Sequence, residues 1–173
     1  LIFEPLAMDR TVFVMTPELY PHLAVGYSVG RDGTVSTDRP AREHWGRGYK
    51  VPNGGIYSTV RDLARFAAGV TGASAVEILP PAWRVETMRI QTADSSTAGY
   101  GLGFSIRTTE GGLRTVGHGG SVAGYNAHLM FDPETTVGVV LLRNYNRGST
   151  NLARRAVTLL EELVQEGVER LTR

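Results

Sequence analysis

The chain has 173 residues, of which 42% are hydrophobic and 20% charged, and its formal net charge is +1. This is the composition of an ordinary globular protein, and so small a charge gives no field to attract nucleic acid or an anionic membrane. No apolar run approaches the roughly 18 residues that span a bilayer. The absence of cysteine excludes disulfides, thiolate catalysis and cysteine-based zinc sites.

Residues 1–57 form a first segment that is rich in loop signals. Prolines and glycines punctuate it, and little helical period is visible. A long irregular span of this kind is uncommon unless it is functional or wraps around another part of the protein. Because the chain begins with Leu1 rather than methionine, we expect any export signal to lie upstream, and the compartment stays open.

Helices are predicted in residues 58–90. Thr59 and Asp62 have the spacing of a capping box, with Asp in place of the usual Glu, and apolar residues recur at helical spacing after them. Gly69 and Gly72 are expected to end this first helix. A second helix is predicted over residues 80–88, since proline is tolerated in the first turn of a helix.

Residues 99–143 have the pattern of antiparallel strands, predicted at 100–108, 113–116, 125–131 and 137–142. The pair Gly111-Gly112 is a hairpin signal, and Asp132-Pro133-Glu134 predicts another turn. The last strand is almost continuously apolar, so it should be buried on both faces. A final helix within residues 150–167 has a leucine-rich stripe that would cover one face of the sheet. The predicted class is α/β of the α+β kind, an antiparallel sheet flanked by helices.

The strongest local motif is Gly117-His118-Gly119-Gly120-Ser121, which follows a predicted strand and precedes Gly124. A backbone so poor in side chains can lie close to a ligand and offer N–H donors to a developing oxyanion. The same pattern is typical of a flexible turn between two strands, with His118 on the surface. Spacing alone leaves both interpretations open.

The motif is also part of an ordered set of segments that resembles the β-lactamase and penicillin-binding-protein type of serine hydrolases. In that family a Lys-Thr-Gly or His-x-Gly triplet lies on the sheet-edge strand beside the active site, and here the triplet would be His118-Gly119-Gly120. The other matching segments are Phe3-Glu4-Pro5-Leu6-Ala7-Met8, Gly54-Gly55-Ile56-Tyr57-Ser58-Thr59 with Asp62, Tyr100-Gly101-Leu102-Gly103-Phe104, Gly124-Tyr125, Phe131-Asp132-Pro133 and Gly138-Val139-Val140. In the first of these, Ala7 replaces a family glycine. The resemblance covers nearly the whole chain. It implies the C-terminal part of one β-lactamase-like domain of class C type.

The family's nucleophile motif, Ser-x-x-Lys, does not occur in this sequence. No serine has a lysine three residues later, Lys50 is the only lysine, and no tyrosine begins a Tyr-x-Asn or Tyr-x-Ser motif. In the family both motifs precede the Pro-Leu-Gly-Met segment, and this chain starts at that segment. We therefore expect truncation or cleavage, rather than mutational loss, to account for the missing half.

The resemblance implies roles for several residues. An acyl-enzyme would form on the absent serine, activated by a lysine, and the residue after the triplet, Ser121, would give one backbone N–H to the oxyanion. His118 would lie beside the absent tyrosine or the substrate carboxylate. A His-Gly-Gly triplet favours the esterase and D-aminopeptidase branches over dedicated β-lactamases. Tyr125 is expected to contact substrate.

Asn151 and Arg154 neighbour each other on the last predicted helix and resemble the family's pair for a substrate carboxylate. Alternatively, Asn151 is simply the cap of a solvated helix N-terminus. Two further polar residues have plain structural interpretations: His128 is expected to be a packed or surface histidine, and Asp62 a residue of the helix start.

Two classes of function remain open from the sequence. The leading one is a serine hydrolase acting on an ester, amide or lactam of a small-molecule or peptide-like substrate. This chain would then be inert alone and would need its missing N-terminal half, either upstream or as a second chain. The alternative is a non-catalytic folded fragment or binding module of the same fold. No cofactor, metal, nucleic acid or membrane span is expected, and a metal-dependent hydrolase is disfavoured because clustered His and Asp ligands are missing.

Overall fold

The computed structural model describes residues 1–38, 48, 51–122, 124–147 and 150–171. Its helices are η1 (Tyr20–His22), α2 (Val60–Thr71), α3 (Pro81–Thr87) and α4 (Leu152–Leu171). Its strands are β1 (Ser28–Val29), β2 (Val35–Ser36), β3 (Thr92–Ala93), β4 (Ala98–Tyr100), β5 (Ser105–Thr108), β6 (Arg114–Val122), β7 (Tyr125–Phe131) and β8 (Gly138–Arg143).

The described residues form a six-stranded sheet in the order β3-β4-β5-β6-β7-β8, and every neighbouring pair is antiparallel. The predicted antiparallel sheet flanked by helices is confirmed. The strand predicted over residues 100–108 is divided, because the chain turns between β4 and β5, where Gly103 has a φ of +88°. β1 and β2 form a separate two-stranded hairpin.

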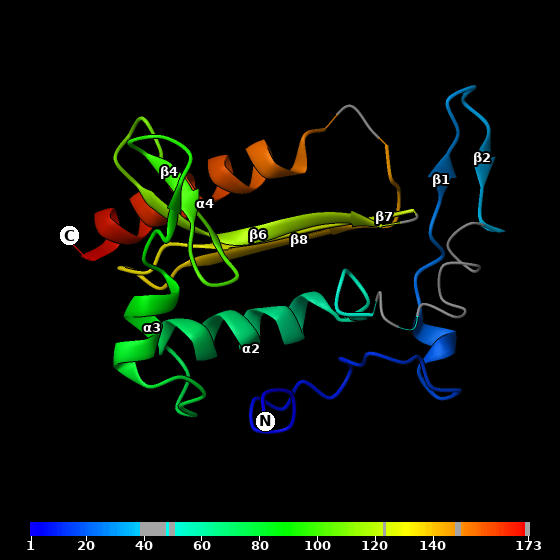
Figure 1. The fold of residues 1–173 in the computed structure, drawn as a ribbon, viewed down its shortest axis with the longest axis horizontal. Coiled ribbons are helices and arrows are strands. Elements are labelled where there is room, and N and C mark those ends of the chain that lie inside the picture. Colours follow the sequence, from blue (N-terminus) through cyan, green and yellow to red (C-terminus); the bar gives the residue numbers. More distant parts are fainter. Residues whose placement is uncertain (39–47, 49–50, 123, 148–149, 172–173) are drawn as a thin grey trace.

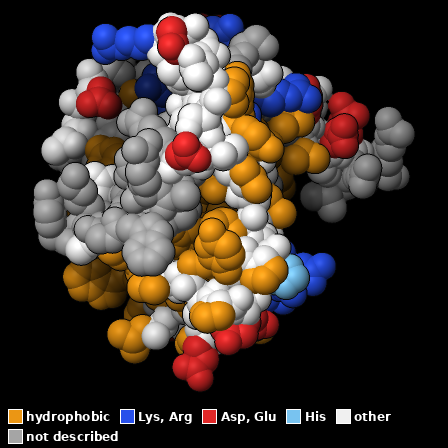
Figure 2. Space-filling view, turned by 90° about the vertical axis from the view of Figure 1, so that its right-hand side faces the viewer, with side chains coloured by type: hydrophobic (Ala, Val, Ile, Leu, Met, Phe, Trp, Pro, Cys, Tyr) orange, Lys and Arg blue, Asp and Glu red, His pale blue; other side chains and the backbone are white. Residues whose placement is uncertain are grey.

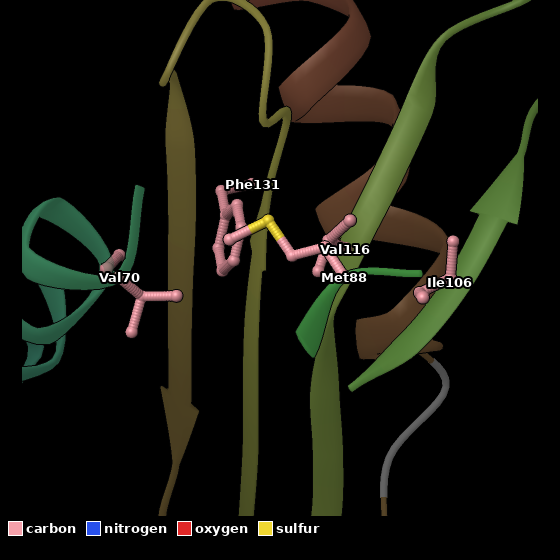
Figure 3. Close-up of a cluster of buried hydrophobic side chains, with 6 residues drawn as sticks. Val70, Met88, Ile106, Val116 and Phe131 are labelled. Atoms are coloured by element: carbon pink, nitrogen blue, oxygen red, sulfur yellow. The ribbon is translucent and has the colours of Figure 1, made fainter. Parts of the chain in front are cut away.

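The two long helices cover opposite faces of the sheet, with α4 above and α2 below it in the view of Figure 1. On the α2 face, Val116 and Phe131 are fully buried and pack with Val70 of the helix. Figure 3 shows these side chains converging with those of Met88 and Ile106. On the α4 face, Ala156 and Leu160 of the helix are fully buried against Val139. The stripe predicted for the last helix therefore does cover one face.

Two details of the predicted elements were wrong. Gly69 does not end the first helix but lies inside α2, where a Cβ would come within 3.0 Å of the side chains of Leu6 and Ile78. The helix ends at Gly72, which has the left-handed φ of +85° that glycine adopts without strain. The last strand is not buried on both faces throughout, since the Leu142 side chain of β8 is 42% exposed.

The N-terminal segment is bound to both sides of this core by hydrogen bonds. Val12 and Tyr57 form an antiparallel bridge beside the start of α2. Further along, Tyr27 forms a parallel bridge with Tyr145, just beyond β8, and the Asn146 side chain accepts a hydrogen bond from Val29 N–H at 2.8 Å. The segment thus runs from the α2 side of the sheet to the β8 edge.

Candidate active site

Strand β6 extends past its neighbour on one side, and the glycine-rich motif lies in the extension. β6 has nine residues, but in the described part of the chain β5 pairs with it only as far as Gly117, which lies opposite Ser105. Residues 118–122 continue to pair with β7 on the other side, from His118 opposite Leu129 to Val122 opposite Tyr125. The flexible-turn interpretation of the motif was therefore wrong, because these residues form a strand.

Two hydrogen bonds at the ends of the strands determine which backbone groups face this extension. Thr109 N–H donates to Leu113 C=O at 2.9 Å, so Leu113 and every second residue after it face β5. Asp132 N–H donates to Val137 C=O at 2.9 Å, so Phe131 faces β6 and bonds Val116. Both patterns agree: Gly119 and Ser121 direct their N–H and C=O groups away from β7. We call this side of residues 118–122, with which no described strand pairs, the unpaired edge.

Side chains of the motif alternate between the two faces of the sheet. His118, Gly120 and Val122 share the α2 face with buried Val116, whereas Gly119 and Ser121 lie on the α4 face. The exposed imidazole of His118 makes an edge-to-face contact with the ring of Tyr100, with centroids 5.8 Å apart and an interplanar angle of 89°. The predicted residues 118–121 are thus consecutive positions of β6 whose side chains alternate between the two faces, and the Ser121 N–H lies at the unpaired edge.

A pocket of about 690 Å³ lies on the α2 face, next to this edge. Helix α2 begins at Val60 and covers only one end of the face, and the pocket lies over the other end. Its apolar lining comes from the N-terminal segment, the start of α2 and the sheet: Met15, Leu19, Leu23, Ile56, Leu63, Gly120, Val122, Tyr125, Ala127 and Leu142. Figure 2 shows hydrophobic side chains gathered on the side of the molecule where η1 and β1 lie.

Tyr125, predicted to contact substrate, lines this pocket. Its hydroxyl donates to Ala24 C=O at 2.7 Å, so it also holds the N-terminal segment against the sheet. Burial raises the pKa of the Tyr125 phenol above its usual value. The ring therefore offers the pocket an apolar wall rather than an ionisable group.

The other predicted pair, Asn151 and Arg154, lies at the start of α4. The Asn151 side chain accepts a hydrogen bond from Arg154 N–H at 3.1 Å, which is the geometry of an N-cap. The cap interpretation is confirmed, while a role toward a substrate carboxylate stays a prediction. Both side chains are exposed.

Sequence reasoning missed Arg143, which joins the start of α4 to the motif. Its guanidinium donates to Asn126 Oδ1 at 3.0 Å and to Thr150 C=O at 3.0 Å. Asn126 is the residue opposite Ser121 in the β6–β7 register. Arg143 therefore connects the strand pair at Ser121 to the residue that precedes Asn151. Its position in a largely apolar strand gave no signal of this role, because Asn126 and Thr150 lie in other segments of the chain.

Two negative findings concern the described residues alone. They contain no group of three or more His, Cys, Asp or Glu side chains placed to hold a metal ion. No helix within the described ranges combines the length and apolar character needed to cross a membrane.

Comparisons with known proteins agree with this architecture. Residues 1–163 match the sequence model of the family described as "Beta-lactamase". The chain is 30% identical over 148 residues to a human protein named "Putative beta-lactamase-like 1", covering 82% of this chain and 27% of that protein. An octameric penicillin-binding protein homologue from Pyrococcus abyssi superposes with a TM-score of 0.71 and 24% identity, over 95% of this chain and 36% of that one. A class C β-lactamase gives a TM-score of 0.71 with 15% identity, over 93% of this chain and 49% of that one.

The chain thus spans between about a quarter and a half of the length of these proteins. The two solved structures are less than 25% identical and show a shared fold. The family match extends over nearly all of the chain, including the motif at residues 117–121. The chain therefore belongs to the β-lactamase family.

Proposed function

We propose that this chain forms the oxyanion-binding side of a serine hydrolase active site that works through an acyl-enzyme. The nucleophile would come from a Ser-x-x-Lys segment outside these 173 residues. The observation that supports this most directly is the register of β6, which directs the Ser121 N–H to the unpaired edge. A rigid backbone donor at that position stabilises the negative charge that develops on a carbonyl oxygen during acyl transfer.

The same edge suits an extended substrate. An acyl or peptide-like chain can lie along residues 118–122 as an added strand, because the backbone groups of Gly119 and Ser121 face outward. Glycines at 119 and 120 keep side chains away from the approaching substrate. His118, at the start of the edge and against Tyr100, would contact the acid/base group or the substrate.

The nucleophile-bearing segment would pack over the apolar pocket beside this edge. The solvent-accessible surface of the chain is 11,215 Å², whereas a compact monomer of this size has about 8,300 Å². Exposed apolar side chains on the pocket's rim include Ile56, which is 50% exposed, and Leu142. An apolar segment that covered the pocket would bury this surface, which supports the need for a second half, either upstream or as a separate chain.

The triplet supports one branch of the family over another. With His118-Gly119-Gly120 in place of Lys-Thr-Gly, we favour an ester or a D-amino acid amide as substrate, with a lactam as the less favoured candidate. The carboxylate-binding role of Asn151 and Arg154 is part of the same proposal. Arg143 supports it, since its hydrogen bond to Thr150 C=O holds the start of α4 close to the strand pair of Ser121.

The experiment uses the gene product that contains this sequence and, in parallel, the 173-residue chain. Both are treated with a fluorophosphonate and with a fluorescent penicillin, and the labelled residue is identified by peptide mapping. We expect one acylated serine, within Ser-x-x-Lys and outside residues 1–173, and no labelling of the chain alone. A gene product with no such motif and no label would instead support the non-catalytic module. Label on a serine within the chain would contradict the proposal.

A further inference from the structure

Gly119, the middle residue of the triplet, lies directly opposite His128 in the β6–β7 pair. A Cβ built on Gly119 would lie 2.1 Å from Cε1 and 2.2 Å from Nδ1 of the His128 ring. Both distances are far below any van der Waals contact. The imidazole of His128 therefore occupies the space that a side chain at position 119 would need.

The pair has no hydrogen bonds of its own. The alternation that directs Gly119 N–H and C=O to the unpaired edge makes Gly119 and His128 a non-hydrogen-bonded pair, the kind in which side chains approach most closely. The ladder holds β6 at His118 and Gly120, on either side. At Gly119 itself, packing of the imidazole ring is the contact that β7 provides.

The surroundings of His128 keep its ring neutral near neutral pH. The side chain is half-buried, and burial is the main cause that lowers its pKa. The charges of His118 on β6 and of Arg143 at the end of β8 lower the pKa further. A neutral imidazole is flat and avoids the desolvation cost of the charged form, which suits a half-buried ring packed against a strand backbone.

We propose that His128 is a positioning residue for the candidate site. Its ring, packed in the side-chain space of Gly119, holds the backbone of residues 119–121 in one orientation, so that the N–H groups at the unpaired edge are preorganised. The consequence for catalysis rests on the proposed function, whereas the effect on the strand does not.

The test of the strand uses the ¹⁵N-labelled 173-residue chain and four variants: His128→Ala, His128→Phe, Gly119→Ala and, as a control in an exposed 3₁₀ turn, His22→Ala. In His128→Ala we expect the amide order parameters of Gly119 and Ser121 to fall from about 0.85 toward about 0.6. His128→Phe keeps a flat ring over Gly119 and should retain the rigid values, as should His22→Ala. In Gly119→Ala the new Cβ displaces the His128 ring, so the order parameters at residues 119 and 121 should fall as they do in His128→Ala. This second variant provides the test if His128→Ala does not fold.

A second readout separates positioning from a general loss of structure. In the gene product, His128→Ala should lower kcat for acylation about tenfold to a hundredfold with little change in KM, and His128→Phe should restore it, because misplacing a catalytic group costs rate rather than binding. Unchanged order parameters at residues 119 and 121 in both folded ring-displaced variants would overturn the inference, whatever the activity. So would a loss of order with no change in kcat. If the order parameters fall as expected but the gene product forms no acyl-enzyme, the proposed function is refuted. The effect of His128 on the strand would then still hold.

Discussion

The carboxylate of Asp62 accepts a hydrogen bond from the hydroxyl of Thr11 at 2.8 Å, across 51 positions of the sequence. The same carboxylate accepts from Arg10 N–H at 2.9 Å, and Asp62 is only 3% exposed. Its own N–H donates to Thr59 Oγ1 at 3.2 Å, as the capping-box spacing predicted. Asp62 is thus a helix-start residue that also binds the N-terminal segment to α2.

Replacing Asp62 with Ala should therefore lower the free energy of unfolding by about 2–3 kcal/mol, because the buried Thr11 hydroxyl and the part-buried Arg10 N–H lose a charged acceptor. Urea unfolding followed by circular dichroism measures this. Asp9→Ala is the matched control, since Asp9 is an exposed carboxylate in the same segment, and it should change stability by less than about 0.5 kcal/mol. Equal losses in the two variants would mean that the Asp62 contacts are not the cause.

Ala7 has a φ of +50°, in the left-handed region that L residues rarely adopt. It stands where the resembled family has glycine. Ala7→Gly should stabilise the chain by about 0.5–1 kcal/mol. The substitution relieves the strain of the left-handed conformation, and the greater entropy of glycine in the unfolded state offsets part of that gain. Ala75→Gly, at an exposed position outside the positive-φ residues of the described chain, should be neutral or destabilising. A destabilised Ala7→Gly would contradict the assigned backbone conformation.

His128 should make the chain less stable in mild acid. Its folded-state pKa is lowered by burial and by His118 and Arg143, whereas the unfolded chain titrates near the ordinary value of about 6.5. As the pH falls through about 6.5 the unfolded state takes up a proton first, so the free energy of unfolding decreases until the folded-state pKa is also passed. The contribution is fully present above about pH 7. In His128→Gln this part of the pH dependence should disappear, while His22→Gln should leave it unchanged.

The two roles of Asn151 can be separated by substitution. Asn151→Ala should cost about 1 kcal/mol of stability through loss of the cap, and Asn151→Asp should retain it. If the pair also binds a substrate carboxylate, Asn151→Asp should raise KM in the gene product by like-charge repulsion, and Arg154→Ala should raise KM without loss of stability. A substrate amide without the carboxylate should show neither effect. Unchanged KM in both variants would leave Asn151 as a cap alone.

The sequence predicted most elements because their patterns are local. The bounds of β7 were predicted as observed, since alternation and flanking turn residues mark both of its ends. The Gly117–Ser121 segment could not be assigned from local pattern, because glycine-rich strands and glycine-rich turns share the same composition. Pairing with β7 along its whole length makes it a strand.

Contacts between distant segments were beyond prediction for a different reason. Asp62, Arg143 and His128 were each given a plain structural interpretation or none, because their partners lie in other parts of the chain. The packing of the His128 ring against Gly119 depends on the register between β6 and β7, which spacing along the sequence does not determine. The motif could be recognised from its residues. Which of its N–H groups face the unpaired edge could not be predicted from the sequence.

Proline at position 121 tests whether Ser121 acts through its backbone N–H at the unpaired edge. Because this N–H forms no ladder bond with β7, Ser121→Pro should fold, as proline is tolerated where the N–H faces away from the sheet, whereas Gly120→Pro should lose a ladder bond and be much less stable. Ser121→Ala keeps the donor.

The decisive measurement is kcat for acylation of the gene product with Ser121→Pro and with Ser121→Ala, with circular dichroism to confirm that both are folded. We expect Ser121→Pro to lower kcat at least about a hundredfold, as loss of one oxyanion donor does, while Ser121→Ala stays within about threefold of the unsubstituted protein. Equal activity of the two folded variants would contradict the backbone-donor role of Ser121.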